Sequence, residues 1–290
     1  MAVMRYILLI LILSPSFFQA QMLDPKKSEP LSDQPFFDDD FIRWQKIKSL
    51  KGKYMFIPIE GGIVATDFWI GFEFDTLGRL SNQYETLKND GTSDTTWNYY
   101  SYDEKSRLIE SKKCYLEECI LQQKYWGEDD IIKIKQEIIT NSLKAAELIY
   151  RDSIQTQQSE FLSIQKYYNS TGHLYCMEET KFDYLHRPIF ISKRLLNTSV
   201  VTNEIHTYDI NGKLISLQLY QGTDSTNNKT DRYSYDEAGN LIKQYKAEND
   251  KITKEVDFLY NDIGKLESII TQDYEYNLIT VIRFSEISFY

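Results

Sequence analysis

A seven-residue pattern recurs along the chain and limits the folds open to it. Each copy has an aromatic residue, Asp or Asn, two variable residues, usually Gly, a basic or polar residue and usually Leu. The Asp or Asn side chain can bond the backbone two residues on, and Gly supplies the positive φ of a three-residue hairpin loop closed by a bulge. The seven copies begin at Phe74, Tyr102, Tyr168, Phe182, Tyr208, Tyr235 and Tyr260.

Each copy is predicted to be a tight turn between two antiparallel strands. Between most neighbouring copies the Asp or Asn recurs after about 25 to 28 residues, which leaves room for two strands and a second, looser turn. The interval from Asn169 to Asp183 is only about half as long and holds a single hairpin, and the long interval before Asn169 is expected to contain a degenerate copy near Trp126. The predicted turn residues are Asp75, Gly78, Asp103, Asn169, Gly172, Asp183, Asp209, Gly212, Asp236, Gly239, Asn261 and Gly264.

The segments between the turns predict an all-β fold. They alternate apolar and polar residues or run in β-branched and aromatic residues, as in residues 132–134, 269–273 and 277–284. We expect about 16 to 18 short strands over residues 53–290, in a repetitive antiparallel β-hairpin meander that forms a long curved or coiled sheet. Residues 143–150 would also suit a helix by propensity.

The aromatic residues of the pattern are expected to share one face of this sheet. Residues two apart in a strand point the same way, so Tyr233 with Tyr235 and Phe258 with Tyr260 should form an aromatic ladder. A face this apolar must be shielded from water, and curling of the sheet, the N-terminal helix or a partner could shield it. The chain's 22 tyrosines are explained mainly by this packing, so their number is not evidence for a catalytic site.

The N-terminal region predicts export. Residues 1–20 have the layout of a secretory signal peptide, with Arg5 ahead of an apolar run at 6–13. That run is far shorter than the ~20 residues that span a bilayer, so we expect cleavage and export to the periplasm, the cell surface or the exterior, with no membrane span in the mature chain. Residues 21–36 are polar with three prolines and predict a mobile linker, whereas residues 37–52 predict a short helix.

Export makes disulfides possible. Cys114 and Cys119 bracket four residues, the length of a hairpin loop, so they could face each other across neighbouring strands. A disulfide and a pair of small apolar strand residues both fit this spacing. Cys176 is expected to be a buried, inert thiol.

The sequence offers no set of residues with a known catalytic, cofactor-binding or metal-binding spacing. His173, His186 and His206 fall in different repeat units, and neither a nucleophile elbow nor a phosphate-binding loop is present. A formal net charge of −10 argues against a nucleic-acid partner, and 42% hydrophobic residues exclude global disorder. We therefore expect a protein that is not an enzyme and has no cofactor.

The pattern also resembles a known family. Tyr-Asp-x-x-Gly-(Lys/Arg)-Leu is similar to the YD repeats, or rearrangement-hotspot (RHS) repeats, of bacterial secreted and surface proteins, and the resemblance covers residues 72–290 with gaps. It implies a long antiparallel meander that in large members coils into a hollow shell around a C-terminal toxin. Because the chain ends soon after the last copy, a scaffold without a toxin domain is expected.

These features together predict an exported, non-catalytic YD-repeat scaffold that binds a glycan or a protein. The polar loops at 88–96, 197–199 and 221–229 are candidate binding loops, because variable loops on a rigid scaffold commonly carry binding. One alternative is a hydrolase whose paired carboxylates, about 5 to 9 Å apart and one with a raised pKa, come from different repeats. Another, suggested by the family resemblance alone, is an orphan partner of a secreted toxin system.

Overall fold

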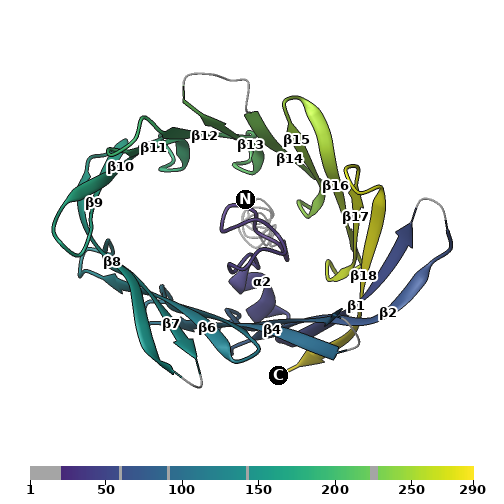
Figure 1. The fold of residues 1–290 in the computed structure, drawn as a ribbon. Coiled ribbons are helices and arrows are strands. Elements are labelled where there is room, and N and C mark those ends of the chain that lie inside the picture. The colour runs from purple at the N-terminus through teal and green to yellow at the C-terminus, as the bar shows by residue number, and fades with distance from the viewer. Residues whose placement is uncertain (1–20, 59–60, 90–91, 142–143, 223–227) are drawn as a thin grey trace, which may run out of the picture.

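The protein is a closed antiparallel barrel. The structure is a computed structural model and describes residues 21–58, 61–89, 92–141, 144–222 and 228–290. Its strands form one 18-stranded sheet, in which each strand pairs with the next along the chain and β18 (Leu278–Phe289) pairs with β1 (Ile47–Pro58) (Figure 1). The other strands are β2 (Val64–Phe74), β3 (Leu80–Asn89), β4 (Thr92–Tyr102), β5 (Leu108–Tyr115), β6 (Glu118–Trp126), β7 (Ile132–Asn141), β8 (Lys144–Gln158), β9 (Leu162–Tyr168), β10 (Leu174–Phe182), β11 (Pro188–Leu195), β12 (Val201–Tyr208), β13 (Leu214–Gln221), β14 (Asn228–Tyr235), β15 (Leu241–Glu248), β16 (Lys251–Tyr260) and β17 (Leu266–Asp273).

The prediction of an all-β antiparallel meander is confirmed, but the expected long curved or coiled sheet is wrong because the two ends of the sheet join. β1 lies between β18 and β2, with Tyr54 opposite Ile282 on one side and Leu50 opposite Phe72 on the other. An open sheet would leave two edges with unpaired backbone groups, and closure removes both. Beside the seam, the Tyr290 hydroxyl donates to the Phe74 carbonyl oxygen.

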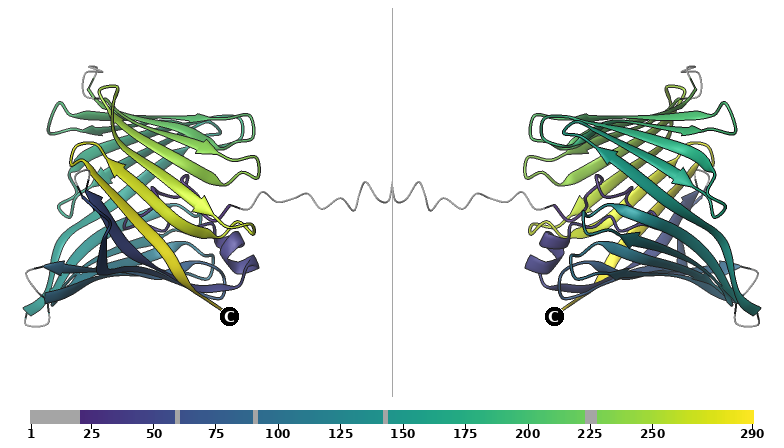
Figure 2. Two further views of the ribbon diagram at one scale, coloured as in Figure 1. Left: turned by 90° about the vertical axis from the view of Figure 1, so that its right-hand side faces the viewer. Right: turned by 90° about the vertical axis from the view of Figure 1, so that its left-hand side faces the viewer.

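The recurring turns lie mainly at one end of the barrel. Six copies follow an even-numbered strand, so a meander places them at the same end, near the short helix (Figure 2). The copy that begins at Tyr168 follows β9 and therefore lies at the opposite end. This explains its short distance from the next copy, because Asn169 and Asp183 bracket the single strand β10. Residues 144–150, within the stretch that also suited a helix, belong to β8.

The chain's own N-terminal segment occupies the interior of the barrel (Figure 1). Residues 21–36, expected to be a mobile linker, pack inside the ring instead, with Met22 and Leu23 fully buried. The helix α2 (Asp39–Trp44) is shorter than the expected helix over 37–52, because β1 already begins at Ile47. The expected signal peptide, residues 1–20, lies outside the described residues.

The main core forms where this segment meets the aromatic ladder. The Phe37 ring lies 5.0 Å from the Phe72 ring and 4.9 Å from the Phe74 ring, both edge to face. Leu241 of the pattern, Phe258 two residues before the last copy, and further luminal residues are buried in the same cluster. Burying this much apolar surface is the main source of folding free energy. The ladder is thus covered both by curling of the sheet and by the N-terminal segment.

Shortening Phe37 should therefore destabilise the whole barrel. We expect Phe37→Ala to lower the free energy of unfolding by about 3–5 kcal/mol, through lost burial and the cavity that remains. Tyr276→Ala is the matched control, because Tyr276 is 77% exposed and should change stability by less than about 0.5 kcal/mol. Urea denaturation of both variants measures the difference, and equal stabilities would contradict this packing.

Candidate functional site

The predicted turn residues form one repeated hydrogen-bonded structure. Asp75 Oδ1 accepts hydrogen bonds from the backbone N–H groups of Leu77 at 2.9 Å and Arg79 at 3.0 Å, while Oδ2 accepts from Arg79 Nε at 2.7 Å. Asp103 and Asp183 bond their own turns in the same way. The glycines of the pattern adopt the positive φ that this bulged turn requires: Gly78, Gly172, Gly212, Gly239 and Gly264.

Side chains of successive units also contact one another. The Arg79 guanidinium lies 4.7 Å from the centre of the Tyr102 ring, and the Tyr102 hydroxyl donates to the Leu80 carbonyl oxygen at 2.8 Å. The same two contacts join Lys213, Tyr235 and the Leu214 carbonyl. The basic and aromatic positions of the pattern therefore link one hairpin to the next.

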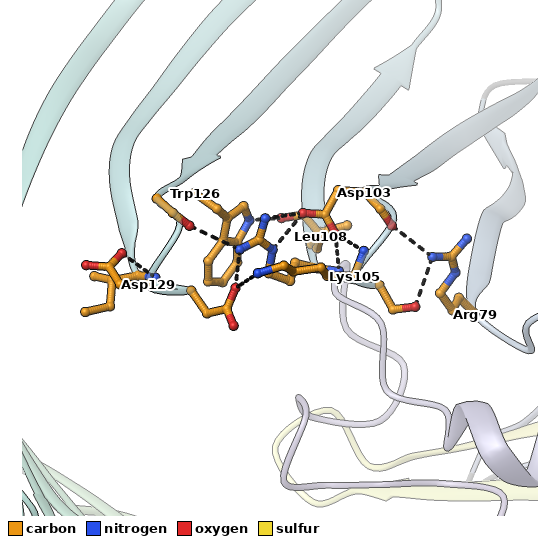
Figure 3. Close-up of polar contacts among 11 residues, drawn as sticks. Arg79, Asp103, Lys105, Leu108, Trp126 and Asp129 are labelled. Carbon is orange, nitrogen blue, oxygen red and sulfur yellow. Dashed lines mark hydrogen bonds and ion pairs between the residues drawn. The ribbon is translucent and has the colours of Figure 1, made fainter.

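The degenerate unit expected near Trp126 uses the same contacts (Figure 3). Trp126 replaces the tyrosine and donates from Nε1 to the Leu108 carbonyl oxygen at 3.1 Å. Arg107 stacks over this ring and bonds Asp130 Oδ1 at 2.5 Å. Asp130 takes the glycine position with φ of 58°. These turns are thus structural, and their acids are engaged in bonds that hold the hairpins.

The histidines and cysteines have separate surroundings in the described structure. The described residues include no group of three or more His, Cys, Asp or Glu that could hold a metal ion. The His186 ring stacks on the Phe161 ring, and both residues lie in turns at the end of the barrel that has most copies of the pattern. Cys114 and Cys119 lie directly opposite each other on β5 and β6 and are joined by a disulfide. Cys176 is buried, and burial raises the pKa of its thiol.

One interior cavity of about 350 Å³ contains two carboxylates. Asp231 of β14 and Glu29 of the N-terminal segment both line it. Burial raises the pKa of Asp231, while Lys246 lowers it to a smaller extent. Glu29 forms an ion pair with the same lysine. The hydrolase alternative requires two carboxylates, one of them with a raised pKa. In this cavity Asp231 has the raised pKa, and Glu29 is held in an ion pair.

A second group of aromatic residues faces away from the barrel interior. Along β4, Asn98 and Tyr100 are buried toward the N-terminal segment, so Trp97 and Tyr99, which alternate with them, point outward. The Trp97 ring lies 6.0 Å from the Tyr99 ring and nearly parallel to it, and 4.9 Å from the ring of Tyr84 on β3. We call Trp69, Tyr84, Trp97 and Tyr99 the outward aromatic strip.

The outward aromatic strip is held in place by its neighbours. The Tyr84 ring lies directly over Gly71, where an added Cβ would come within 2.2 Å of it. Trp97 stands opposite Cys114, so the disulfide flanks it on the same face. Beyond Gly71, Lys51 Nζ lies 4.2 Å from the centre of the Trp69 ring. The strip thus crosses β2, β3 and β4 with its rings fixed from both sides.

Polar groups border the outward aromatic strip. One outward row of cross-strand pairs runs through Tyr99 of the strip and supplies polar side chains on both sides of it, Glu73 and Asn82 on one and Lys112 on the other. Asn82 Nδ2 donates to Glu73 Oε2 at 2.7 Å. Past Trp69 the surface is hollowed into a cleft of about 800 Å³, whose lining includes residues of β1, β17 and β18. Aromatic rings beside amide, carboxylate and ammonium groups can bind a ligand that is apolar on its faces and polar at its edges.

Sequence reasoning missed this strip because it assigned the tyrosines to the luminal ladder. The available signal was the phase of alternation: Trp97 and Tyr99 fall between Asn98 and Tyr100, so the two pairs must point to opposite faces. Of the three loops predicted to bind a ligand, 88–96 and 221–229 are only partly described, since residues 90–91 and 223–227 lie outside the described residues. Residues 197–199 are described and form the short β11–β12 connection.

Comparisons with known proteins show no family for this chain, and the solved structures found have TM-scores below 0.5. No protein-family model matches the chain, and no curated protein matches it. One similar solved structure is a porin-like protein from Bacteroides uniformis, with 10% identity over 84% of this chain and 97% of that chain and a TM-score of 0.39. A Photorhabdus luminescens Tc holotoxin pore has 15% identity over 75% of this chain and 12% of that chain, with a TM-score of 0.31. A DUF1329 family protein from Desulfovibrio piger has 8% identity over 87% of this chain and 88% of that chain, with a TM-score of 0.21.

The resemblance to YD or RHS repeats is therefore corrected. No family model supports it, and the hairpins close into an 18-stranded ring filled by the chain's own N-terminal segment instead of extending as a coiled shell. A short turn pattern reports the hairpin geometry that any such turn needs, so it identifies the turn and not the family. The toxin-partner alternative rested on this resemblance and goes with it.

Within the described part of the chain, no helix is both long enough and apolar enough to cross a membrane.

The raised pKa of Asp231 predicts a pH-dependent stability. A carboxyl group whose pKa rises on folding binds its proton more tightly in the folded state, so its stabilising effect is present at low pH and is lost as pH rises through the raised pKa. Asp231→Asn lacks this titration and should therefore gain thermal stability relative to the native chain as pH increases. Melting curves from pH 3 to 8 measure the gap, and a gap that does not change with pH would contradict the assignment.

Proposed function

We propose that the chain is an exported, non-catalytic binding protein that holds a glycan on its outward aromatic strip. The observation that carries this proposal is the group of adjoining rings on the outward side of a rigid sheet, where Trp97 is stacked on Tyr99 and lies against the tilted ring of Tyr84. The luminal ladder is covered by the N-terminal segment and is not available for binding.

The chemistry of the strip suits a sugar. A pyranose ring has faces of C–H groups, which pack on aromatic π-faces, and edges of hydroxyl groups, which need hydrogen-bond partners. The strip supplies the rings, and the adjoining row supplies the amide of Asn82, the carboxylate of Glu73 and the ammonium of Lys112. A protein partner would not specifically need this alternation of flat rings and short polar side chains.

The strip is also pre-organised. Tyr84 is fixed over Gly71 and Trp97 is flanked by the disulfide, so few rotamers are left to freeze when a ligand binds. Binding surfaces that are rigid beforehand pay less conformational entropy on association. A barrel wall that is paired on both sides of every strand provides such rigidity.

The strip's position on the outer wall keeps it accessible. Elsewhere the outward face has charged side chains in mid-strand, such as Lys243, whose ammonium contacts Glu255 at 2.5 Å and Asp257 at 3.0 Å. Such a charge-bearing wall suits contact with water, and a glycan approaching from water would reach the strip without any opening of the barrel.

Removing rings from the strip should weaken glycan binding without unfolding the barrel. We expect Tyr99→Ala to weaken binding about ten-fold and the Trp97→Ala, Tyr99→Ala double variant to weaken it further, because each ring contributes stacking area. Tyr99 is 39% exposed, so its loss should change stability little. A glycan array followed by calorimetry on the bound glycans measures the effect.

The matched control is Tyr245→Ala, since Tyr245 also points outward but lies on β15, away from the strip. It should bind like the native protein. If the native protein binds no glycan, or if Tyr245→Ala weakens binding as much as Tyr99→Ala, the proposal is wrong. Capture of a protein with no glycan bound would favour a protein ligand instead.

A further inference from the structure

Two positive charges face each other at the end of the outward aromatic strip. Arg283 of β18 is paired directly with Lys53 of β1, and both point outward, because their neighbours Ile282 and Tyr54 are buried in the interior. Like charges directly opposite one another destabilise a sheet. This pair therefore has an electrostatic cost that the fold itself does not require.

Nearby acids do not fully neutralise the pair. Lys53 Nζ lies 3.5 Å from Asp67 Oδ1, and the Asp67 side chain is 77% exposed, so this ion pair is screened by water. Arg283 has no ion pair among the described residues, and its other cross-strand neighbour is Ser268. Glu267 also lines the cleft, so both it and Asp67 would oppose a bound anion.

The pair lies where the aromatic strip meets the cleft. Arg283 and Lys53 both line the cleft of about 800 Å³, together with Ser268 and Ser285. Lys53 Nζ also lies 5.4 Å from the centre of the Trp69 ring, so a ligand stacked on this ring would have its next group beside the two cations. The guanidinium is suited to bidentate bonding of a planar or tetrahedral oxyanion, and the serine hydroxyls are further donors.

We infer that the glycan bound by this protein is acidic, with a carboxylate, sulfate or phosphate group seated between Arg283 and Lys53. This inference rests on the proposed glycan-binding function and specifies its ligand class. The bound oxyanion would relieve the repulsion between the two cations while the sugar ring packs on the outward aromatic strip.

The test compares charged and neutral sugars on one array. Uronic-acid oligosaccharides, sulfated oligosaccharides and neutral oligosaccharides of equal length are the probes, and the two acidic sets tell which oxyanion is preferred. We expect acidic sugars to bind, and Arg283→Gln and Lys53→Gln each to weaken binding about ten-fold or more, as for loss of a charge-assisted hydrogen bond. Binding should also weaken with added salt.

The control is Arg232→Gln, since Arg232 is also an outward, exposed arginine in mid-strand but lies on β14, away from the cleft. A second readout does not need the sugar: sodium sulfate should raise the melting temperature of the native protein more than sodium chloride of equal ionic strength. Since sulfate stabilises folded proteins in general, the expected result is that Arg283→Gln makes this difference smaller while Arg232→Gln leaves it unchanged. Binding confined to neutral sugars, or unchanged in Arg283→Gln, would overturn this inference and leave the proposed function standing. Binding to no sugar would overturn the proposed function itself.

Discussion

The fold depends on burial of the luminal aromatic and leucine side chains under the N-terminal segment. A ring of 18 strands is too wide for its own wall side chains to fill, so without residues 21–46 the ladder at the turn end would face water. Phe37 and its neighbours fill that space, which fixes the inward face of the strands that contact this cluster, β1 to β5 and β12 to β18. The outward face is then free to differ from unit to unit.

The recurring pattern stabilises the contacts between hairpins. Its acid closes the turn, while its basic residue and the next aromatic residue contact each other across units, as Arg187 does with Tyr208 at 4.5 Å. Next to the seam, Lys265 has the basic role and Phe289 of β18 has the aromatic role, with the Lys265 ammonium over the Phe289 ring. Local turn chemistry and long-range pairing thus agree, and such agreement is what lets one sequence specify one structure.

Some of this could be predicted from the sequence and some could not. Turns and strands follow from local spacing, which is why hairpins such as that at Asp209 and Gly212 are readable directly. Closure could not be read, because it pairs β1 with β18, which are separated by almost the whole chain. The outward aromatic strip needed knowledge of which alternating residues face inward, and the cover from Met22 and Leu23 sits in a stretch whose prolines and polar residues suggested mobility.

Amide hydrogen exchange along β1 tests the central claim, closure of the ring, most directly. Backbone N–H groups of a strand point to its two neighbours in turn, so those of residues 50–56 are divided between β2 and β18, with the alternation interrupted where the register shifts near Lys51 and Lys53. Closure predicts that consecutive amides in this range exchange slowly, since both sides are bonded. If the amides that point toward β18 exchanged as fast as those of an exposed edge strand, the ring would be open and the account would be wrong.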